Sequence, residues 1–306
     1  VRNRTAANAV RRLLTANPAP LYDASFASLI TPGNLEDDLE KLREADWIIE
    51  AIVEQLEAKK ALFSRLENVW TPGTLVSTNT SGLSIAKMTA SCGEALQQHV
   101  LVTHFFNPPR YMKLLEVVPG PRTKPELVEA FAAFAERRLG KAVVRAKDTP
   151  NFIANRIGTF GLLAALREMT ENGYTPEEID AVTGPAMGRP KSATFRTLDL
   201  VGIDTFLHVA DNVYHRTSDE RERAAFAVPE LLRAMAARGW IGEKCGQGFY
   251  RKVKDERGAS RILALNPATM SYAPAAQPKS ASLDAARAAK GAAAKIRALL
   301  AGNDRY

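Results

Sequence analysis

Cysteine is scarce in this sequence, which has only Cys92 and Cys245 among its 306 residues. Two cysteines cannot build a disulfide framework or a cysteine-only zinc site, and no spacing of cysteine and histidine suits another metal centre. No apolar run approaches the roughly 20 residues that a membrane span requires. The start, Val1 to Arg4, is not followed by the apolar segment of a secretory signal. We therefore expect a cytoplasmic protein with neither a membrane span nor a metal.

Several short motifs that mark phosphate-binding or acyl-transfer sites are also missing. No glycine triplet fits G-x-G-x-x-G, there is no Walker loop, and no Gly-x-Ser-x-Gly elbow suggests a serine hydrolase. Gly246-Gln247-Gly248 is followed by Arg251 where the third glycine would stand. A glycine-rich phosphate cradle and the first strand that would lead into it are therefore absent. We therefore expect a chain truncated at its N-terminus, the middle of a longer polypeptide.

The excess of positive charge is confined to the end of the chain. The sequence has 41 Lys and Arg against 34 Asp and Glu, a net charge of +7. Residues 251–306 alone carry 11 basic and 4 acidic side chains, so the first 250 residues are neutral. A neutral main body does not favour a nucleic-acid partner. We interpret the basic tail as a solvated face rather than a binding patch.

Residues 1–147 alternate between apolar runs and amphipathic stretches. Strands alternating with helices predict an α/β domain, with a Rossmann-like, doubly wound and mostly parallel sheet. The expected helices are 5–16, 58–70 and 126–139, and the expected strands are 28–30, 47–54, 74–77, 100–103, 114–118 and 141–145.

After Asp148-Thr149-Pro150 the pattern becomes helical. Residues 148–252 are therefore predicted to form an all-α domain, in which Thr175-Pro176-Glu177-Glu178 opens a helix as a capping box. Residues 253–306 are interrupted by prolines and are predicted to be a basic linker and one terminal helix, from Ser282 to Leu300. The other helices expected in the all-α domain are 153–171, 205–216 and 229–238.

His104 and Glu116 stand in successive predicted strands, twelve positions apart. The intervening Asn107-Pro108-Pro109-Arg110 favours a turn, and a hairpin centred near Arg110 would place the two side chains together. An imidazole accepts a proton near neutral pH, and a carboxylate on its other nitrogen fixes the tautomer and stabilises the cation. Taken alone, a histidine beside a strand is more often a packed, hydrogen-bonded residue than a catalytic one, and a glutamate in a strand is usually just exposed.

Asn79-Thr80-Ser81-Gly82 follows one strand and precedes a helix. In a doubly wound sheet this position puts Ser81 at the carboxyl edge of the strands, where ligands bind. A plain turn or helix cap would explain the same residues. Asn155 lies early in a predicted helix among apolar neighbours and carries little meaning alone.

The motifs acquire more meaning when they are read in order. They are Glu50-Ala51-Ile52-Val53-Glu54, Asn79-Thr80-Ser81, His104-Phe105-Phe106-Asn107-Pro108 with Leu114-Leu115-Glu116-Val117, the segment from Lys147 to Arg156, and the segment from Lys244 to Tyr250. In this order and spacing they resemble the L-3-hydroxyacyl-CoA dehydrogenase family. The chain is most similar to its bacterial multidomain members, in which this unit is fused with an enoyl-CoA hydratase.

The resemblance implies an NAD-dependent enzyme that oxidises L-3-hydroxyacyl-CoA to 3-ketoacyl-CoA in fatty acid β-oxidation. It implies that His104 takes the 3-hydroxyl proton and that Glu116 orients this base. Ser81 and Asn155 would hold the hydroxyl or the developing ketone.

The resemblance also implies a cofactor side and partners. Lys244 would close over the bound NAD, acyl-CoA would bind in a cleft between the domains, and the helical domain would form a homodimer. The residues implied on the NAD side are Glu54, Lys59, Ser81 and Asn107.

Three features depart from the family pattern, namely the missing glycine loop, Asn151 where the family usually has glycine, and a longer segment at 187–194. Two other hypotheses therefore stay open. One is a dehydrogenase of free 3-hydroxy acids, and the other is a non-catalytic scaffold in a multifunctional assembly.

Overall fold

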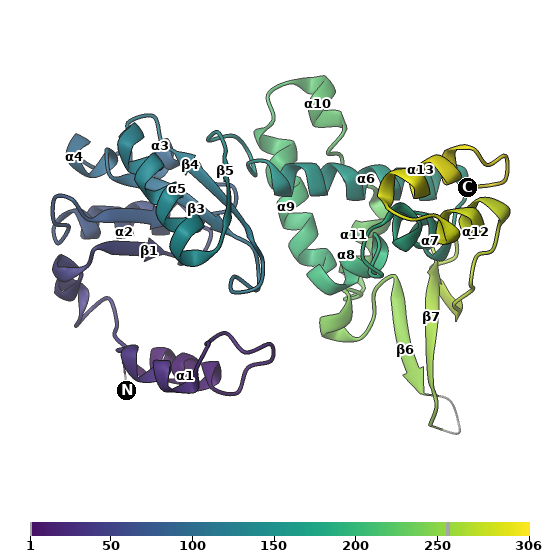
Figure 1. Cartoon of the computed structure of the whole chain (residues 1–306), viewed down its shortest axis with the longest axis horizontal. Helices are drawn as coiled ribbons and strands as arrows, with labels where there is room; N and C mark the ends of the chain where they lie inside the picture. Colours follow the sequence, from purple (N-terminus) through teal and green to yellow (C-terminus); the bar gives the residue numbers. More distant parts are fainter. Residues whose placement is uncertain (1, 255–257) are drawn as a thin grey trace. The chain divides into compact units, whose positions relative to one another are not determined.

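The structure is a computed structural model that describes residues 2–254 and 258–306. The chain divides into two compact units, residues 1–153 and residues 154–306, and each is described by itself (Figure 1).

The first unit is built on a five-stranded sheet in the order β1-β2-β3-β4-β5. Neighbouring strands are parallel except for β3 and β4, which are antiparallel. The mostly parallel sheet predicted from the sequence is confirmed. The strands are β1 Trp47–Glu50, β2 Leu75–Thr78, β3 Val100–Phe105, β4 Leu114–Pro119 and β5 Ala142–Arg145.

Helices cover both faces of this sheet, because successive residues of a buried strand point to opposite sides. Val100 and Val102 of β3 pack in one core with α2 Leu56–Glu67, α3 Ile85–Met88 and α4 Glu94–Gln97. Leu101 packs in a second core with α5 Pro125–Leu139. The near-continuous apolar sequence of β3 follows from this double burial.

The N-terminal part of this unit differs from expectation in two places. Helix α1 Arg4–Leu13 forms as predicted, but the strand expected at 28–30 is wrong. This region is a 3₁₀ helix, η1 Ala24–Leu29, because Asp23 caps it by accepting the amide of Ser25 at 2.8 Å. Strand β1 ends at Glu50 rather than at residue 54, and Ile49 in this edge strand is 48% exposed.

The second unit is helical from residue 154 to residue 240. The predicted capping box is present, since Thr175 accepts the Glu178 amide and the Glu178 carboxylate accepts the Thr175 amide. One large core holds these helices together. The elements are α6 Ala154–Asn172, α7 Pro176–Thr183, η3 Pro185–Met187, α8 Phe195–Val201, α9 Ile203–Arg216, α10 Glu220–Ala224, α11 Glu230–Ala237 and, beyond residue 240, η4 Glu243–Cys245.

The prediction of a basic linker and a single terminal helix for residues 253–306 is wrong. Antiparallel strands β6 Tyr250–Lys254, β7 Ser260–Asn266 and β8 Ser271–Pro274 form a small sheet. Two helices follow, α12 Ala281–Ala288 and α13 Ala292–Leu300. The backbone is extended at Ala289, which ends α12, and Gly291, with φ of +81°, directly precedes α13. Residues 255–257 of the expected linker lie outside the described residues.

The tail packs against the body of the second unit. Leu265 of β7 is buried in the same core as Phe249, and Leu283 and Leu299 of the last two helices are buried with Ala186 of η3. A polar contact adds to this, since the Tyr174 hydroxyl donates to the Arg305 carbonyl at 3.0 Å. Along the described residues, every helix falls short of the length or apolar character that membrane crossing demands.

Candidate active site

The prediction that the side chains of His104 and Glu116 lie together is confirmed. Strands β3 and β4 form an antiparallel pair in which these residues stand directly opposite each other. His104 Nδ1 lies 2.6 Å from Glu116 Oε2, and the two residues are only 5% and 1% exposed. Nδ1 must donate to the carboxylate, which leaves Nε2 as the nitrogen that can accept a proton.

The segment that follows β5 encloses this pair. The amide of Ile153 donates to the other carboxylate oxygen, Glu116 Oε1, at 3.0 Å. The ring of Phe152 packs against the imidazole with centroids 5.6 Å apart. Asn151 and Phe152 have φ values of +58° and +50°. A left-handed backbone explains why glycine suits position 151 and why asparagine, which tolerates that region, can replace it.

The turn with Ser81 is held to the same edge of the sheet by side chains on either side. Asn79 Oδ1 accepts the amide of Phe105, next to His104, at 3.0 Å. Ser84 Oγ donates to Asp148 Oδ2 at 2.7 Å. The ends of β2, β3 and β5 are therefore linked by hydrogen bonds, and Asp148 is a linking residue that the sequence analysis missed.

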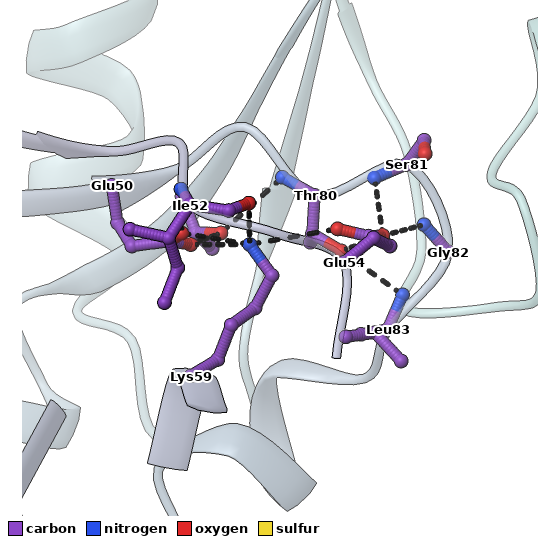
Figure 2. Close-up of polar contacts among 9 residues, drawn as sticks. Glu50, Ile52, Glu54, Lys59, Thr80, Ser81, Gly82 and Leu83 are labelled. Carbon is purple, nitrogen blue, oxygen red and sulfur yellow. Dashed lines mark hydrogen bonds and ion pairs between the residues drawn. The ribbon is translucent and has the colours of Figure 1, made fainter. Parts of the chain in front are cut away.

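Glu54 joins the turn from the neighbouring strand end. Its Oε1 accepts the backbone amides of Ser81 and Gly82 at 3.0 and 3.2 Å and the hydroxyl of Thr80 (Figure 2). The carboxyl ends of parallel strands are where open α/β sheets bind ligands.

Lys59, expected on the NAD side, lies beneath this turn. Its side chain is 1% exposed, and Nζ donates to both oxygens of Glu50, at 2.7 and 2.8 Å (Figure 2). A buried ammonium with these partners cannot touch a ligand directly. The sequence analysis missed Glu50 as its partner, although a charged residue inside the apolar run 47–53 was a signal.

Asn107 is exposed on the β3–β4 connection. This connection is held to the N-terminal segment by Arg110, whose guanidinium donates to the Ala19 carbonyl at 2.7 Å and lies 4.0 Å from the ring centroid of Tyr22.

Asn155 and Lys244 belong to the second unit. Asn155 is in the first turn of α6 and is half-buried. Lys244 lies in η4, half-exposed, and its Nζ donates to Asp204 Oδ2 at 2.6 Å. This hydrogen bond lowers the pKa of the Asp204 carboxyl.

The glycine-rich turn beside Lys244 wraps a buried carboxylate. Asp199 accepts the amides of Phe249 and Tyr250, each at 2.8 Å, and burial raises its pKa to about 6 against the opposing effect of these amides. A Cβ on Gly248 would lie 2.0 Å from Asp199 Oδ1. The glycine at 248 is therefore required by packing.

The first unit fits the reactive half of a nicotinamide dinucleotide better than its pyrophosphate. Glu54 has a side chain 27% exposed, Ser81 is half-buried and Asn107 is exposed, so each can meet a ligand at the strand ends. Backbone amides of a glycine-rich loop normally hold the pyrophosphate. The sequence contains no such fingerprint.

Comparison with known proteins shows the family of this chain. Residues 3–149 match the family model for the 3-hydroxyacyl-CoA dehydrogenase NAD binding domain, and residues 152–252 match the model for its C-terminal domain. A probable 3-hydroxyacyl-CoA dehydrogenase of Bacillus subtilis is 51% identical over 305 residues, which is 100% of this chain and 38% of that protein. A putative fatty acid oxidation complex trifunctional enzyme of Rickettsia felis is 31% identical, over 86% of this chain and 37% of that protein.

The crystal structure of M. tuberculosis FadB2 is similar with a TM-score of 0.70 and 30% identity, covering 82% of this chain and 85% of that one. The chain spans well under half the length of the Bacillus subtilis and Rickettsia felis relatives. Its two matched segments together cover most of its residues, in the order of the family's two domains. The chain belongs to the 3-hydroxyacyl-CoA dehydrogenase family.

Proposed function

We propose that this chain carries the catalytic residues for NAD-dependent oxidation of L-3-hydroxyacyl-CoA to 3-ketoacyl-CoA, in fatty acid β-oxidation. The observation that supports it most is the buried hydrogen bond between His104 and Glu116. The family to which the chain belongs and the acyl-CoA names of its relatives support the substrate class.

His104 is the general base in this proposal. Its Nε2 takes the proton of the 3-hydroxyl. Nδ1–H remains hydrogen-bonded to Glu116, whose carboxylate stabilises the imidazolium that forms. Ser81 and Asn155 hold the substrate oxygen as it changes from hydroxyl to ketone. When bound, NAD supplies the chemistry of accepting the hydride.

The other proposed site residues act on the cofactor side. Glu54, Ser81 and Asn107 line the nicotinamide end, and Lys244 closes over the cofactor. Lys59, being buried, contributes through Glu54.

The test replaces His104 with Gln in a polypeptide that holds these 306 residues together with a glycine-rich pyrophosphate loop. Turnover should fall by about 10²–10⁴-fold, with the affinities for NADH and coenzyme A retained. His215→Gln is the control, since His215 is exposed and its Nδ1 contacts the Asp211 carbonyl of its own turn at 2.8 Å. Undiminished turnover in His104→Gln would remove His104 from the mechanism.

One rival is a non-catalytic scaffold within a multifunctional assembly. The scaffold hypothesis predicts no NADH binding even when a glycine-rich loop is supplied. A dehydrogenase of free 3-hydroxy acids differs in another way, because coenzyme A should not compete with its substrate.

Two partners are part of the proposal. Ile157 and Phe160 on α6 are 66% and 49% exposed, and an apolar face of this kind supports a homodimer through the helical unit. Sedimentation that shows only monomer at micromolar concentration would contradict it. The trifunctional relative supports a fused or associated enoyl-CoA hydratase.

A further inference from the structure

A buried ion pair lies beneath the turn that carries Ser81. The side chains of Lys59 and Glu50 are 1% and 0% exposed. Besides Lys59, Glu50 accepts the amide of Ile52 at 2.6 Å and the hydroxyl of Thr78, so its carboxylate is fixed from three directions. A pair buried this deeply adds little net stability, because desolvation of the two charges offsets their attraction.

Lys59 connects this pair to Glu54. Its Nζ lies 3.5 Å from Glu54 Oε2, while Glu54 Oε1 accepts the amides of Ser81 and Gly82 (Figure 2). Two consecutive amides that face one carboxylate oxygen form an anion-binding concavity. The buried cation therefore meets one oxygen of Glu54 and the turn meets the other.

We propose that Glu50 and Lys59 are positioning residues of the candidate active site. Lys59 directs the Glu54 carboxylate into the amides of Ser81 and Gly82, and Glu50 fixes Lys59. The proposal rests on the proposed function in that Ser81 must hold the substrate oxygen. Neither Glu50 nor Lys59 reaches the reacting atoms, since both side chains are buried.

The partial exposure of Glu54 explains why this guidance matters. With 27% of its side chain exposed, Glu54 can turn toward water once the attraction of Lys59 is removed. The amides of Ser81 and Gly82 then lose their acceptor, and the turn gains freedom to open. The buried charge of Lys59, beneath the turn, therefore sets the position of the Ser81 hydroxyl through Glu54.

The test uses the 306-residue chain and needs neither cofactor nor substrate. The double variant E50Q/K59M removes both buried charges with little change in shape, and such replacements are often neutral for stability. We expect thermal unfolding close to wild type, yet amide hydrogen exchange at Ser81 and Gly82 faster by about tenfold, the effect of losing roughly one hydrogen bond. A role in stability alone predicts unchanged exchange.

Glu54→Gln is the second variant, because it perturbs the turn without touching the buried pair, and it should accelerate exchange at the same two amides. Lys60→Met is the matched control, since it breaks only the exposed Lys60–Glu57 pair on α2 and should leave exchange unchanged. Wild-type exchange in either E50Q/K59M or E54Q overturns the proposal, and so does failure of E50Q/K59M to fold. A polypeptide that holds these residues together with a glycine-rich loop and still never turns over substrate would refute the proposed function but leave these exchange rates as predicted.

Discussion

Replacing Glu116 with glutamine probes the chemistry of the buried pair most directly, because the shape is kept and the charge is lost. Both carboxylate oxygens accept from N–H donors, Oε2 from His104 at 2.6 Å and Oε1 from Ile153 at 3.0 Å. Glutamine offers one acceptor oxygen and one donor NH₂. In either orientation of the amide, one donor therefore faces another.

Each orientation has a distinct consequence. If the amide oxygen faces Ile153, the NH₂ group faces Nδ1 and forces the proton of His104 onto Nε2, where a base needs a lone pair. If the oxygen faces His104, the tautomer survives, but the Ile153 amide is left without an acceptor and the imidazolium without a counter-charge. A buried donor without a partner costs about 1–3 kcal/mol, and loss of general-base help slows turnover by about 10²–10⁴-fold.

We therefore expect E116Q to lose stability and turnover by these amounts together. Urea unfolding measures the stability of the 306-residue chain, and NADH formation measures turnover in a polypeptide that also holds a glycine-rich loop. Glu129→Gln is the control, since Glu129 is exposed and pairs with Arg145 at the surface. Full turnover in E116Q would refute the reasoning, whatever its stability.

Three predictions concern other parts of the chain. Calorimetric titration of NADH into the 306-residue chain should give weak binding, because its sequence has no glycine-rich loop for the pyrophosphate; tight binding would mean that the cofactor is held by another route. Gly248→Ala should cost about 3 kcal/mol or more, because its Cβ would lie 2.0 Å from a carboxylate oxygen. Gly246→Ala, with open space and φ of +77°, should cost only about 1–2 kcal/mol, so equal thermal shifts would contradict the packing argument. The Ser282 hydroxyl and amide lower the pKa of Asp304 to about 2, so the contribution of Asp304 to tail stability is present above the unfolded pKa of about 3.9 and is lost as pH falls toward 2. Hydrogen-exchange protection of the α12 amides should therefore decrease over this pH range in the wild type. Asp304→Asn should remove this pH dependence, and the control Asp284→Asn should keep it.

Local patterns were enough to predict the reactive pair and much of the sheet. His104 and Glu116 meet because a turn-prone segment stands midway between two strands, so symmetry about Arg110 sets the register. The capping box at Thr175 is local in the same way. Features of this kind depend on neighbours in sequence, which periodicity and turn chemistry describe well.

Contacts between distant segments could not be predicted in this way. Nothing in the sequence near Lys59 indicates that its side chain is buried, since that depends on how α2 packs beside β1. Strand β7 has one buried end only, so its apolar pattern is too short to stand out. At residues 28–30 a favourable strand composition failed because no neighbouring strand is there to pair with in the described sheet.

The shared core of the tail and the helical unit has a consequence for how this protein can be divided. The family match ends at residue 252, inside β6, and the pairing partner β7 begins only at Ser260. A cut there would split a sheet and remove Leu265 from the side of Phe249. The helical unit and the tail should therefore melt in one cooperative transition. Any exchange of this module between proteins has to carry the tail with it, at least as far as α13.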